Sequence, residues 1–384
     1  MKKDWKTMKL GEIGIVVTGS TPSTKDESNY SSKDYCFVKP SDISNETISI
    51  IQETEAYISA NAYSKCRKLP CGSVLTTCIG IIGKVGILKV DATCNQQING
   101  IIPHKAHITS EFLAYSLIAR KRYLQGIANA PIVPIINKKE FSDVAITIPS
   151  ITEQEKIVAE LDCLSGIIEK KKQQLKELDA LAQSIFYEMF GDPDNSPFPK
   201  HPLNYLSNLK LSYGSGASAV QYDGKVRYVR ITDIQEEGKL DANAMSPSEY
   251  DDKYLLNDGD ILFARSGATV GKTYHYKILD GKAIYAGYLI RFVPNQELVL
   301  PEYIFYFTKS DYYNAFIKKT AQAVAQPNIN AKQYGDLLVC VPPIDLQQDF
   351  ASKIEAIEKQ KELIRSSIQE TETLFNSRMD YYFG

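Results

Sequence analysis

Two stretches of the chain carry apolar residues at the spacing of a long helix. In each stretch the apolar positions alternate in steps of four and three residues, which is the heptad pattern of a coiled coil. The first seam comprises Ile157, Leu161, Leu164, Ile168, Leu175, Leu178, Ala182, Ile185 and Met189, with Lys171 as a polar break. The second comprises Phe350, Ile354, Ile357, Ile364, Ile368 and Phe375, with Lys361 and Thr371 as polar breaks. Both runs far exceed an average helix of about 11–12 residues, which favours a coiled coil over a surface helix on a globular core.

Start and stop signals bound both helical stretches. Thr152 and Glu155 have the spacing of a capping box, and Gly191 is followed closely by a proline. Asp345 and Gln348 repeat the capping arrangement at the second stretch. The sequence therefore predicts helices over 151–191 and 344–384, each of roughly 38 residues and ~57 Å at ~1.5 Å per residue.

The blocks on either side of the first helix have a different pattern. Short runs rich in β-branched residues, separated by Gly, Asp and Asn, predict strands near 73–77, 86–90, 259–263 and 288–293. One helix follows in each block, near 111–125 and 302–318. We expect α+β globular domains at 1–150 and 192–343.

The two halves of the chain are similar to each other. Residues 35–43 match 226–234, residues 72–75 match 259–262, and from 136–137 against 329–330 the match keeps one register to the chain end. Drifting register in the first part indicates loop insertions, and fixed register in the last part indicates a rigid element. The expected fold class is α+β, with two globular domains separated by two long helices that form an antiparallel coiled coil, and with an internal pseudo-twofold repeat.

Composition sets broad limits. The net charge is −2, but residues 1–150 alone carry a surplus of Lys and Arg, and both helical stretches are acidic. Bulk charge therefore permits nucleic-acid binding without indicating it. Seven cysteines without a Cys-x-x-Cys pair indicate reduced thiols, and the spacing of Cys94, His104 and His107 is a poor match to a zinc site. There is no 18-residue apolar run and no apolar leader, so we expect a cytoplasmic protein that does not insert in membranes.

Several short motifs follow one another in an order that is repeated in the two halves. Those that carry a resemblance to a known family lie at 19–22, 37–43, 95–103 and 148–157 in the first half, and at 264–272 in the second. In these motifs and their order the chain resembles the specificity subunit of Type I restriction-modification systems, over nearly its whole length. It departs from the pattern where Leu346 precedes Gln347, because the first copy has Glu153 before Gln154, and where Gly216-Ala217 falls near the position of Thr21-Pro22.

The resemblance implies a DNA-binding subunit without catalysis of its own. It would recognise a bipartite target in double-stranded DNA, with one half-site for each globular domain. It would dock two modification (adenine methyltransferase) subunits and, for cleavage, restriction (motor) subunits. S-adenosylmethionine would bind the methyltransferase partner, and no cofactor is expected here. The sequence agrees, because it lacks the [DNS]-P-P-[YF] tetrapeptide of methyltransferases. The nearest match, Val341-Pro342-Pro343-Ile344, has the wrong residues on either side of the two prolines.

Candidate DNA contacts follow from residue type and from position in the turn-rich stretches. Arg and Lys read guanine edges and phosphates, Asn and Gln read adenine, and Ser and Thr serve either. In the first domain the candidates are Lys39, Thr76, Thr77 and Lys84. In the second they are Arg227, Arg230, Arg265, Thr269, Lys272, Gln326 and Asn328. The alternative for each is an ordinary loop residue or a turn former.

Three other functions remain open on the sequence alone. A coiled-coil scaffold would show no salt-dependent affinity for duplex DNA. A nucleotide hydrolase would use the glycine loop at 267–273, which is one residue short of the phosphate-binding motif. A fused methyltransferase is disfavoured by the missing tetrapeptide. The acidic helix faces and the seam breaks at Lys171 and Lys361 lead us to expect that partner helices pack there.

Overall fold

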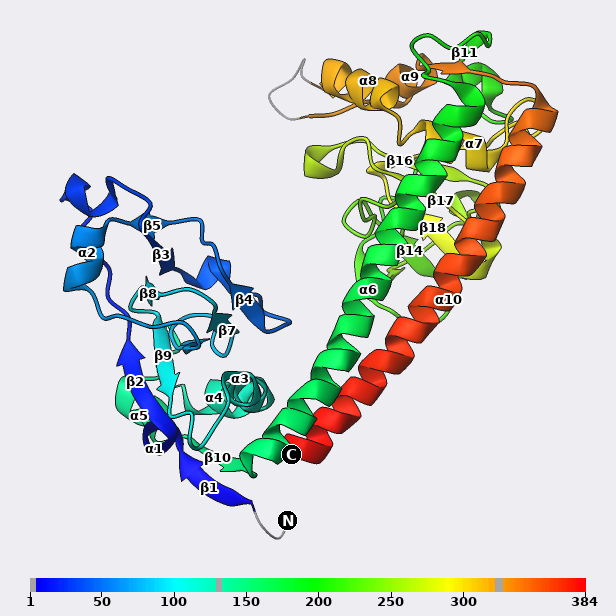
Figure 1. Ribbon diagram of the computed structural model, residues 1–384. Helices are drawn as coiled ribbons and strands as arrows, with labels where there is room; N and C mark the ends of the chain where they lie inside the picture. The colour runs from blue at the N-terminus through cyan, green and yellow to red at the C-terminus, as the bar shows by residue number, and fades with distance from the viewer. Residues whose placement is uncertain (1–4, 129–132, 322–326) are drawn as a thin grey trace. The chain divides into compact units, whose positions relative to one another are not determined.

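The computed structural model describes residues 5–128, 133–321 and 327–384. The chain divides into two compact units, one formed by residues 1–170 with 368–384 and the other by residues 171–367. Each unit combines a β-rich domain with parts of two long helices, α6 (Ile151–Phe190) and α10 (Ile344–Phe383). In Figure 1 α6 is green and α10 is orange to red.

Helices α6 and α10 pair in antiparallel fashion. In the first unit the guanidinium of Arg378 contacts Glu160, and in the second unit Lys361 pairs with Asp179. The two helices therefore run in opposite directions, and Figure 1 shows α6 and α10 side by side. The predicted antiparallel pair is confirmed, as is the α+β class. The predicted caps are wrong, because α6 begins at Ile151, before Thr152, and α10 begins at Ile344, before Asp345.

The first β-rich domain is built on a five-stranded sheet with the order β2-β9-β6-β7-β4. A three-stranded sheet, β5-β3-β8, and the pair β1-β10 complete it. The strands are β1 (Lys6–Lys9), β2 (Gly14–Thr18), β3 (Tyr35–Val38), β4 (Ser49–Ile51), β5 (Tyr57–Ile58), β6 (Val74–Thr77), β7 (Val85–Leu88), β8 (Ala92–Cys94), β9 (Ile98–Pro103) and β10 (Ala145–Ile148). The helices are α1 (Leu10–Ile13), α2 (Ala60–Lys65), α3 (Ser110–Ala119), α4 (Lys121–Ile127) and α5 (Lys138–Ser142).

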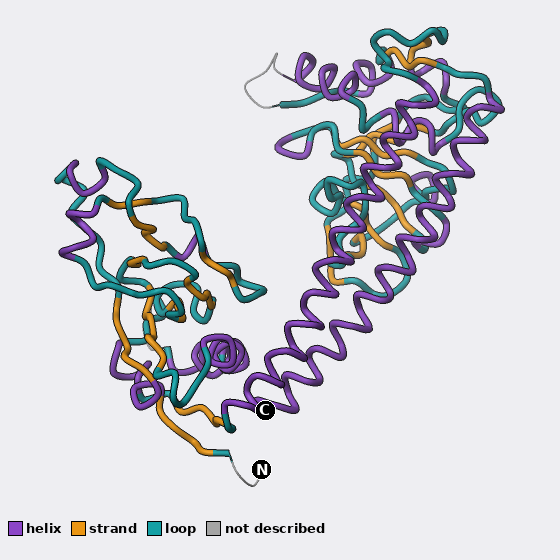
Figure 2. Tube along the Cα trace, in the orientation of Figure 1, coloured by secondary structure: helices purple, strands orange, loops and turns teal. Residues whose placement is uncertain are grey.

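The second β-rich domain has a four-stranded sheet with the order β12-β19-β16-β17, and the pairs β11-β20, β13-β15 and β14-β18. Its strands are β11 (Lys200–Pro202), β12 (Ser212–Tyr213), β13 (Ala219–Gln221), β14 (Arg227–Val229), β15 (Met245–Pro247), β16 (Ile261–Ala264), β17 (Thr273–His275), β18 (Ala283–Tyr285), β19 (Leu289–Phe292) and β20 (Leu338–Cys340). Its helices are α7 (Pro301–Phe307), α8 (Asp311–Ala321) and α9 (Ala331–Gly335). The strands are short and loops make up much of the domain (Figure 2).

The two domains repeat one topology. The antiparallel run β2-β9-β6-β7 corresponds to β12-β19-β16-β17, the parallel pair β3-β8 to β14-β18, and the closing pair β1-β10 to β11-β20. Strand β4 adds a fifth strand only in the first sheet. The single helix expected in each block is wrong, because the helix breaks at Arg120 in one domain and at Thr308 in the other. The internal repeat is therefore visible in strand order and pairing.

A buried glutamine joins each domain to the helix that follows it. The Gln154 carbonyl oxygen accepts from the Thr109 amide at 2.9 Å, and its amide nitrogen donates to the carbonyls of His107 and Pro149. Gln347 repeats all three bonds, accepting from Leu300 at 2.8 Å and donating to the carbonyls of Leu298 and Pro342. An inserted residue here would break three hydrogen bonds in a buried site. This explains why the sequence register is fixed from this point on.

The ends of the helix pair belong to the cores of the domains. In the first unit Ile157 and Leu161 of α6 and Met379 of α10 are buried in one apolar cluster with Phe112 of α3. In the second unit the cluster contains Phe186 and Phe190 of α6 and Phe350 of α10, together with Tyr303. Phe186 and Phe190 lie one position after the expected seam residues Ile185 and Met189, which are only half-buried. The core of the second domain packs on the side of α6 that carries Phe186 and Phe190, so these residues are buried in place of the expected ones.

Candidate nucleic-acid interface

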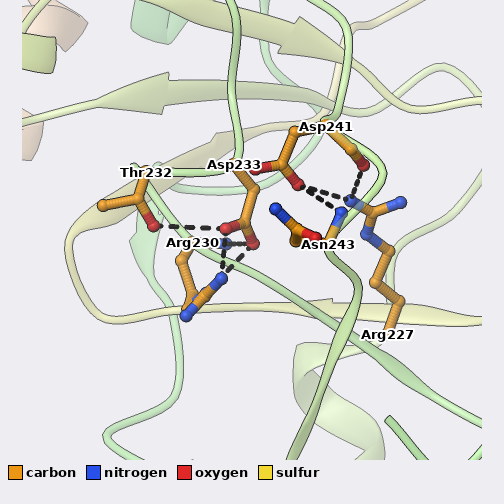
Figure 3. Close-up of polar contacts among 6 residues, drawn as sticks. All are labelled: Arg227, Arg230, Thr232, Asp233, Asp241 and Asn243. Atoms are coloured by element: carbon orange, nitrogen blue, oxygen red, sulfur yellow. Dashed lines mark hydrogen bonds and ion pairs between the residues drawn. The ribbon is translucent and has the colours of Figure 1, made fainter. Parts of the chain in front are cut away.

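Two of the expected DNA-contacting arginines are held inside the second domain. Arg230 donates from Nε and Nη2 to the two carboxylate oxygens of Asp233, at 3.1 and 2.6 Å. Arg227 on β14 donates from Nη2 to the carbonyl of Asp241 at 2.7 Å and lies 3.5 Å from its carboxylate. Figure 3 shows the two arginines with their aspartates on the loop that follows β14.

The charge of this network is balanced internally. Asp233 is fully buried and also accepts from the Arg230 backbone amide and the Thr232 hydroxyl. The hydrogen bonds that the guanidinium donates to Asp233 raise the pKa of Arg230 above its ordinary value, so the guanidinium stays charged and bound. A guanidinium committed to a buried carboxylate would have to break that pair before it could reach a base. Arg227 and Arg230 therefore shape the loop in this conformation.

Two expected lysines occupy equivalent positions, and each reaches a backbone carbonyl of the loop that follows the parallel strand. Lys84 donates from Nζ to the Pro40 carbonyl at 2.8 Å. Lys272 points its Nζ at the Ile234 carbonyl, 3.4 Å away, and forms an ion pair of 2.8 Å with Glu236. Each lysine thus ties the turn after a central strand to the loop after β3 or β14.

Two of the three expected threonines make structural contacts, whereas the hydroxyl of the third, Thr76, is buried without a hydrogen-bond partner among the described residues. Thr76 and Thr77 on β6 are fully buried. The Thr77 hydroxyl donates to the Ile81 carbonyl at 2.6 Å and accepts from the Lys84 amide, which closes the turn between β6 and β7. Thr269 donates to the Ser266 carbonyl at 3.1 Å within a 3-10 turn. That turn, and not a phosphate-binding loop, accounts for the local glycines.

Arg265 and Asn328 come together on the surface of the second domain. Arg265 Nε lies 3.3 Å from the Asn328 carbonyl oxygen, and the guanidinium carbon lies 4.7 Å from the ring centre of Tyr213. The Tyr213 hydroxyl accepts from the Ala331 amide at 3.0 Å, which fixes the ring. The sequence reading missed Tyr213, although its aromatic side chain beside a glycine in a short strand was a usable signal. The expected contact Gln326 lies outside the described residues.

Lys39 completes the set of expected contacts. It is exposed, and its backbone amide donates to Asp42 at 2.7 Å, so the turn presents the lysine side chain to solvent. Lys39 and Arg265 with Asn328 are thus the expected residues that lie at the surface.

The polar seam positions are satisfied between α6 and α10. Lys361 is only 2% exposed and lies 2.5 Å from Asp179 of α6, with a second contact to Glu358. Burial lowers the pKa of Lys361, but the hydrogen bonds that Nζ donates to both carboxylates outweigh this, and the net pKa is raised. Lys171 donates to the Ser367 hydroxyl at 2.6 Å. The expectation that these lysines mark an unsatisfied seam is wrong, because each has its partner on the opposite helix.

A duplicated β-rich fold with exposed basic, amide and aromatic side chains at strand ends is typical of a DNA-binding protein with two recognition domains. Comparison with known families agrees. The family model for the Type I restriction modification DNA specificity domain matches residues 2–180 and 217–373. The chain belongs to this family and is a DNA specificity subunit of a Type I restriction-modification system.

Similar proteins extend over most of the chain. The MjaIX specificity subunit of Methanocaldococcus jannaschii is 27% identical over 383 residues, covering 92% of this chain and 87% of the relative. The EcoR124I/EcoR124II specificity subunit of Escherichia coli is 30% identical over 198 residues, covering 49% and 47%. The crystal structure of the S subunit from M. genitalium has the same fold, with a TM-score of 0.59 at 12% identity over 99% of this chain and 96% of that one.

Membership of this family has consequences for catalysis and for partners. Specificity subunits are non-catalytic, and methylation and cleavage are the work of partner subunits. DNA and the modification and restriction subunits are accordingly the partners that the family implies. Within the described residues no helix is both long and apolar enough to span a membrane.

Proposed function

We propose that this chain recognises a bipartite DNA target, with one half-site read by each β-rich domain, and that methyltransferase subunits dock on the helix pair. The observation that carries the proposal is the duplication itself. The clamps of Gln154 and Gln347 make the same three hydrogen bonds. The equivalent positions Lys39 and Arg230 differ, because Lys39 is exposed whereas Arg230 is paired with Asp233. One scaffold with two unlike surfaces suits two unlike half-sites.

Mapping of methylated adenines at base resolution, in cells that carry this chain and its methyltransferase partner, tests the bipartite target. The expected pattern is two short specified blocks separated by an unspecified spacer of fixed length. A single continuous recognition sequence would contradict the proposal. A coiled-coil scaffold would show neither pattern, and its affinity for duplex DNA would not fall with salt.

The helix pair is proposed to set the spacer length. Insertion of seven residues after Lys170 and of seven more after Ser367 would lengthen both helices while keeping the heptad register. At ~1.5 Å per residue this adds ~10 Å, or about three base pairs of DNA. We expect the two specified blocks to remain and the spacer to grow by about that amount. A lengthened protein that methylates the original sites would contradict the role of the helices.

Exposed apolar side chains on the helices support docking of a partner. Leu363 is 73% exposed, and Leu181, Leu374 and Ile167 are also exposed, outside the seam between α6 and α10. An aspartate at such a position would place a charge in a buried interface. We expect Leu363→Asp to weaken co-purification of the methyltransferase at least tenfold. Gln369→Asp, at an exposed position of α10 about 120° round the helix from Leu363, is the matched control and should retain it.

A further inference from the structure

The second β-rich domain has four arginines between residues 192 and 343, and three of them are paired with aspartates. Arg227 pairs with Asp241, Arg230 with Asp233, and Arg291 with Asp260 at 2.7 Å. Arg291 and Asp260 are both buried, so this pair is also internal. These three guanidinium groups are already neutralised by the fold.

Arg265 is the fourth arginine, and it differs from the others. Among the described residues no carboxylate forms an ion pair with it, and neither Nη nitrogen donates a hydrogen bond to any of them. Its guanidinium instead lies over the ring of Tyr213, which holds the positive charge without neutralising it. Nε is used by Asn328, so the two Nη groups remain for a ligand. Tyr213 is 41% exposed, and Tyr288, whose backbone carbonyl accepts from the Arg265 amide, is 63% exposed.

The backbone around Arg265 is braced by contacts that recur in the first domain. The Arg265 amide donates to the Tyr288 carbonyl and its carbonyl accepts from Ile329. In the first domain the Cys78 amide donates to the Gln97 carbonyl, and the Cys78 carbonyl accepts from Ile136. Arg265 and Cys78 are therefore equivalent positions of the repeat.

The side chains at these equivalent positions have opposite character. Cys78 is buried, and Ile135, which bridges to Ile79, takes the place of Asn328, which bridges to Ser266. Ile135 is 39% exposed, and Ile81 and Val133 in the same region are also exposed apolar residues. The first domain thus has an apolar surface where the second has an arginine, an amide and aromatic rings.

We propose that Arg265 is a specificity-determining residue that reads a guanine in the half-site of the second domain, and that Tyr213 is the positioning residue that orients it. The proposal rests on the bipartite function above and adds the residue and the base. Two parallel N–H groups match the O6 and N7 acceptors of guanine in the major groove, and no other base edge offers that pair. A ring held by its own hydrogen bond to Ala331 limits the rotation of the guanidinium before DNA binds.

The test uses the complex of this chain with its methyltransferase and a library of duplexes in which each base pair of the methylation-mapped target is varied. For Arg265→Ala we expect discrimination at one G·C pair of one half-site to fall roughly 5- to 150-fold, with the other half-site unchanged. Tyr213→Ala should weaken discrimination at the same pair. Tyr213→Phe keeps the ring but loses the hydrogen bond from Ala331, so its loss should be smaller. In the double variant Arg265→Ala with Tyr213→Ala the two losses should not add, because Tyr213 acts through Arg265.

Two control variants separate base reading from general effects. Lys225→Ala removes an exposed positive charge of the same domain and should leave discrimination at every base pair unchanged. Cys78→Ser, at the equivalent position of the first domain, should leave both half-sites unchanged. Retained reading of the first half-site in every variant shows that the complex has assembled and folded.

The outcomes distinguish the two proposals. If Arg265→Ala leaves discrimination intact at all positions while two half-sites are still read, the role of Arg265 is wrong and the bipartite function stands. If Arg265→Ala lowers affinity equally for all sequences, Arg265 contacts phosphate and the base assignment is wrong. If the target of the unaltered complex is not divided into two blocks, the proposed function itself fails, whatever the variant does.

Discussion

The two β-rich domains share a buried framework and differ at the surface. Both enter their long helix through a buried glutamine with the same three hydrogen bonds, and both hold the turn after a parallel strand with an aspartate. The turn aspartate of the first domain binds backbone amides, whereas that of the second also binds an arginine side chain. Duplication therefore preserved the contacts that define the fold and left side-chain roles free to change.

The largest expected difference between the domains concerns this aspartate. Asp233→Ala would leave the half-buried Arg230 guanidinium without its carboxylate, and we expect a loss of about 3–5 kcal/mol in the free energy of unfolding. Asp42→Ala removes acceptors for two backbone amides, those of Lys39 and Glu55, and should cost about 1–2 kcal/mol. Urea denaturation with hydrogen exchange assigned to each unit measures both. Equal losses would mean that the Arg230 pair adds no stability.

The buried glutamines should behave alike. Gln154→Leu and Gln347→Leu each remove one acceptor and two N–H donors from a buried site, which leaves a backbone N–H and two carbonyls unpaired. We expect each to lower the free energy of unfolding by about 2–4 kcal/mol. Gln348→Leu, at the exposed neighbour, is the control and should change it by less than about 0.5 kcal/mol. A large difference between the two buried variants would show that the clamps are equivalent in geometry only.

Lys309, which follows the C-terminal end of α7, should make the stability of the second domain depend on pH in a way that the first domain does not. Thr109 and Leu300 are equivalent because each donates its amide to a clamp glutamine, so Lys309 takes the place of Ile118, nine residues further on. Burial lowers the pKa of Lys309 to about 8. The unfolded chain therefore holds this proton more tightly than the folded protein, so stability should rise as the pH increases from about 8 towards the ordinary lysine value. Lys309→Ile, which installs the residue of the first domain, should stabilise the protein at pH 7 by about 1–2 kcal/mol and remove that rise.

Thermal unfolding followed at pH 7, 8 and 9.5 distinguishes the two proteins. Lys309→Arg is the matched control, since it keeps a charge at the site at every one of these pH values. If the unaltered protein and Lys309→Ile gain the same stability between pH 8 and 9.5, another group is responsible for the titration.

The smallest effect is expected at Lys39, which occupies the position of Arg230 but is exposed. Lys39→Ala should change the free energy of unfolding by less than about 0.5 kcal/mol. If Lys39 contacts a phosphate, the slope of log affinity against log salt should fall by about one, with the recognised sequence unchanged. An unchanged slope would exclude Lys39 from the DNA contact.

Much of the architecture could be predicted from the sequence. The heptad spacing of residues such as Leu161 and Ile354, and the constant register of the second half of the repeat, predict two long helices in a duplicated chain. These signals are local, because the spacing of an apolar helix face is set by residues close together in the sequence. The strands near residues 73–77 and 259–263 were found for the same reason.

The state of each polar side chain was decided by tertiary structure. Arg227, Arg230 and Arg265 are alike in a sequence, yet two are bound to aspartates of one loop and the third stacks on Tyr213. Lys361 breaks the apolar seam in the sequence, but in the fold it is paired with Asp179 on the other helix. Partners so distant along the chain cannot be read from spacing, since a side chain's role depends on which opposite charge or ring the fold brings within a few ångströms.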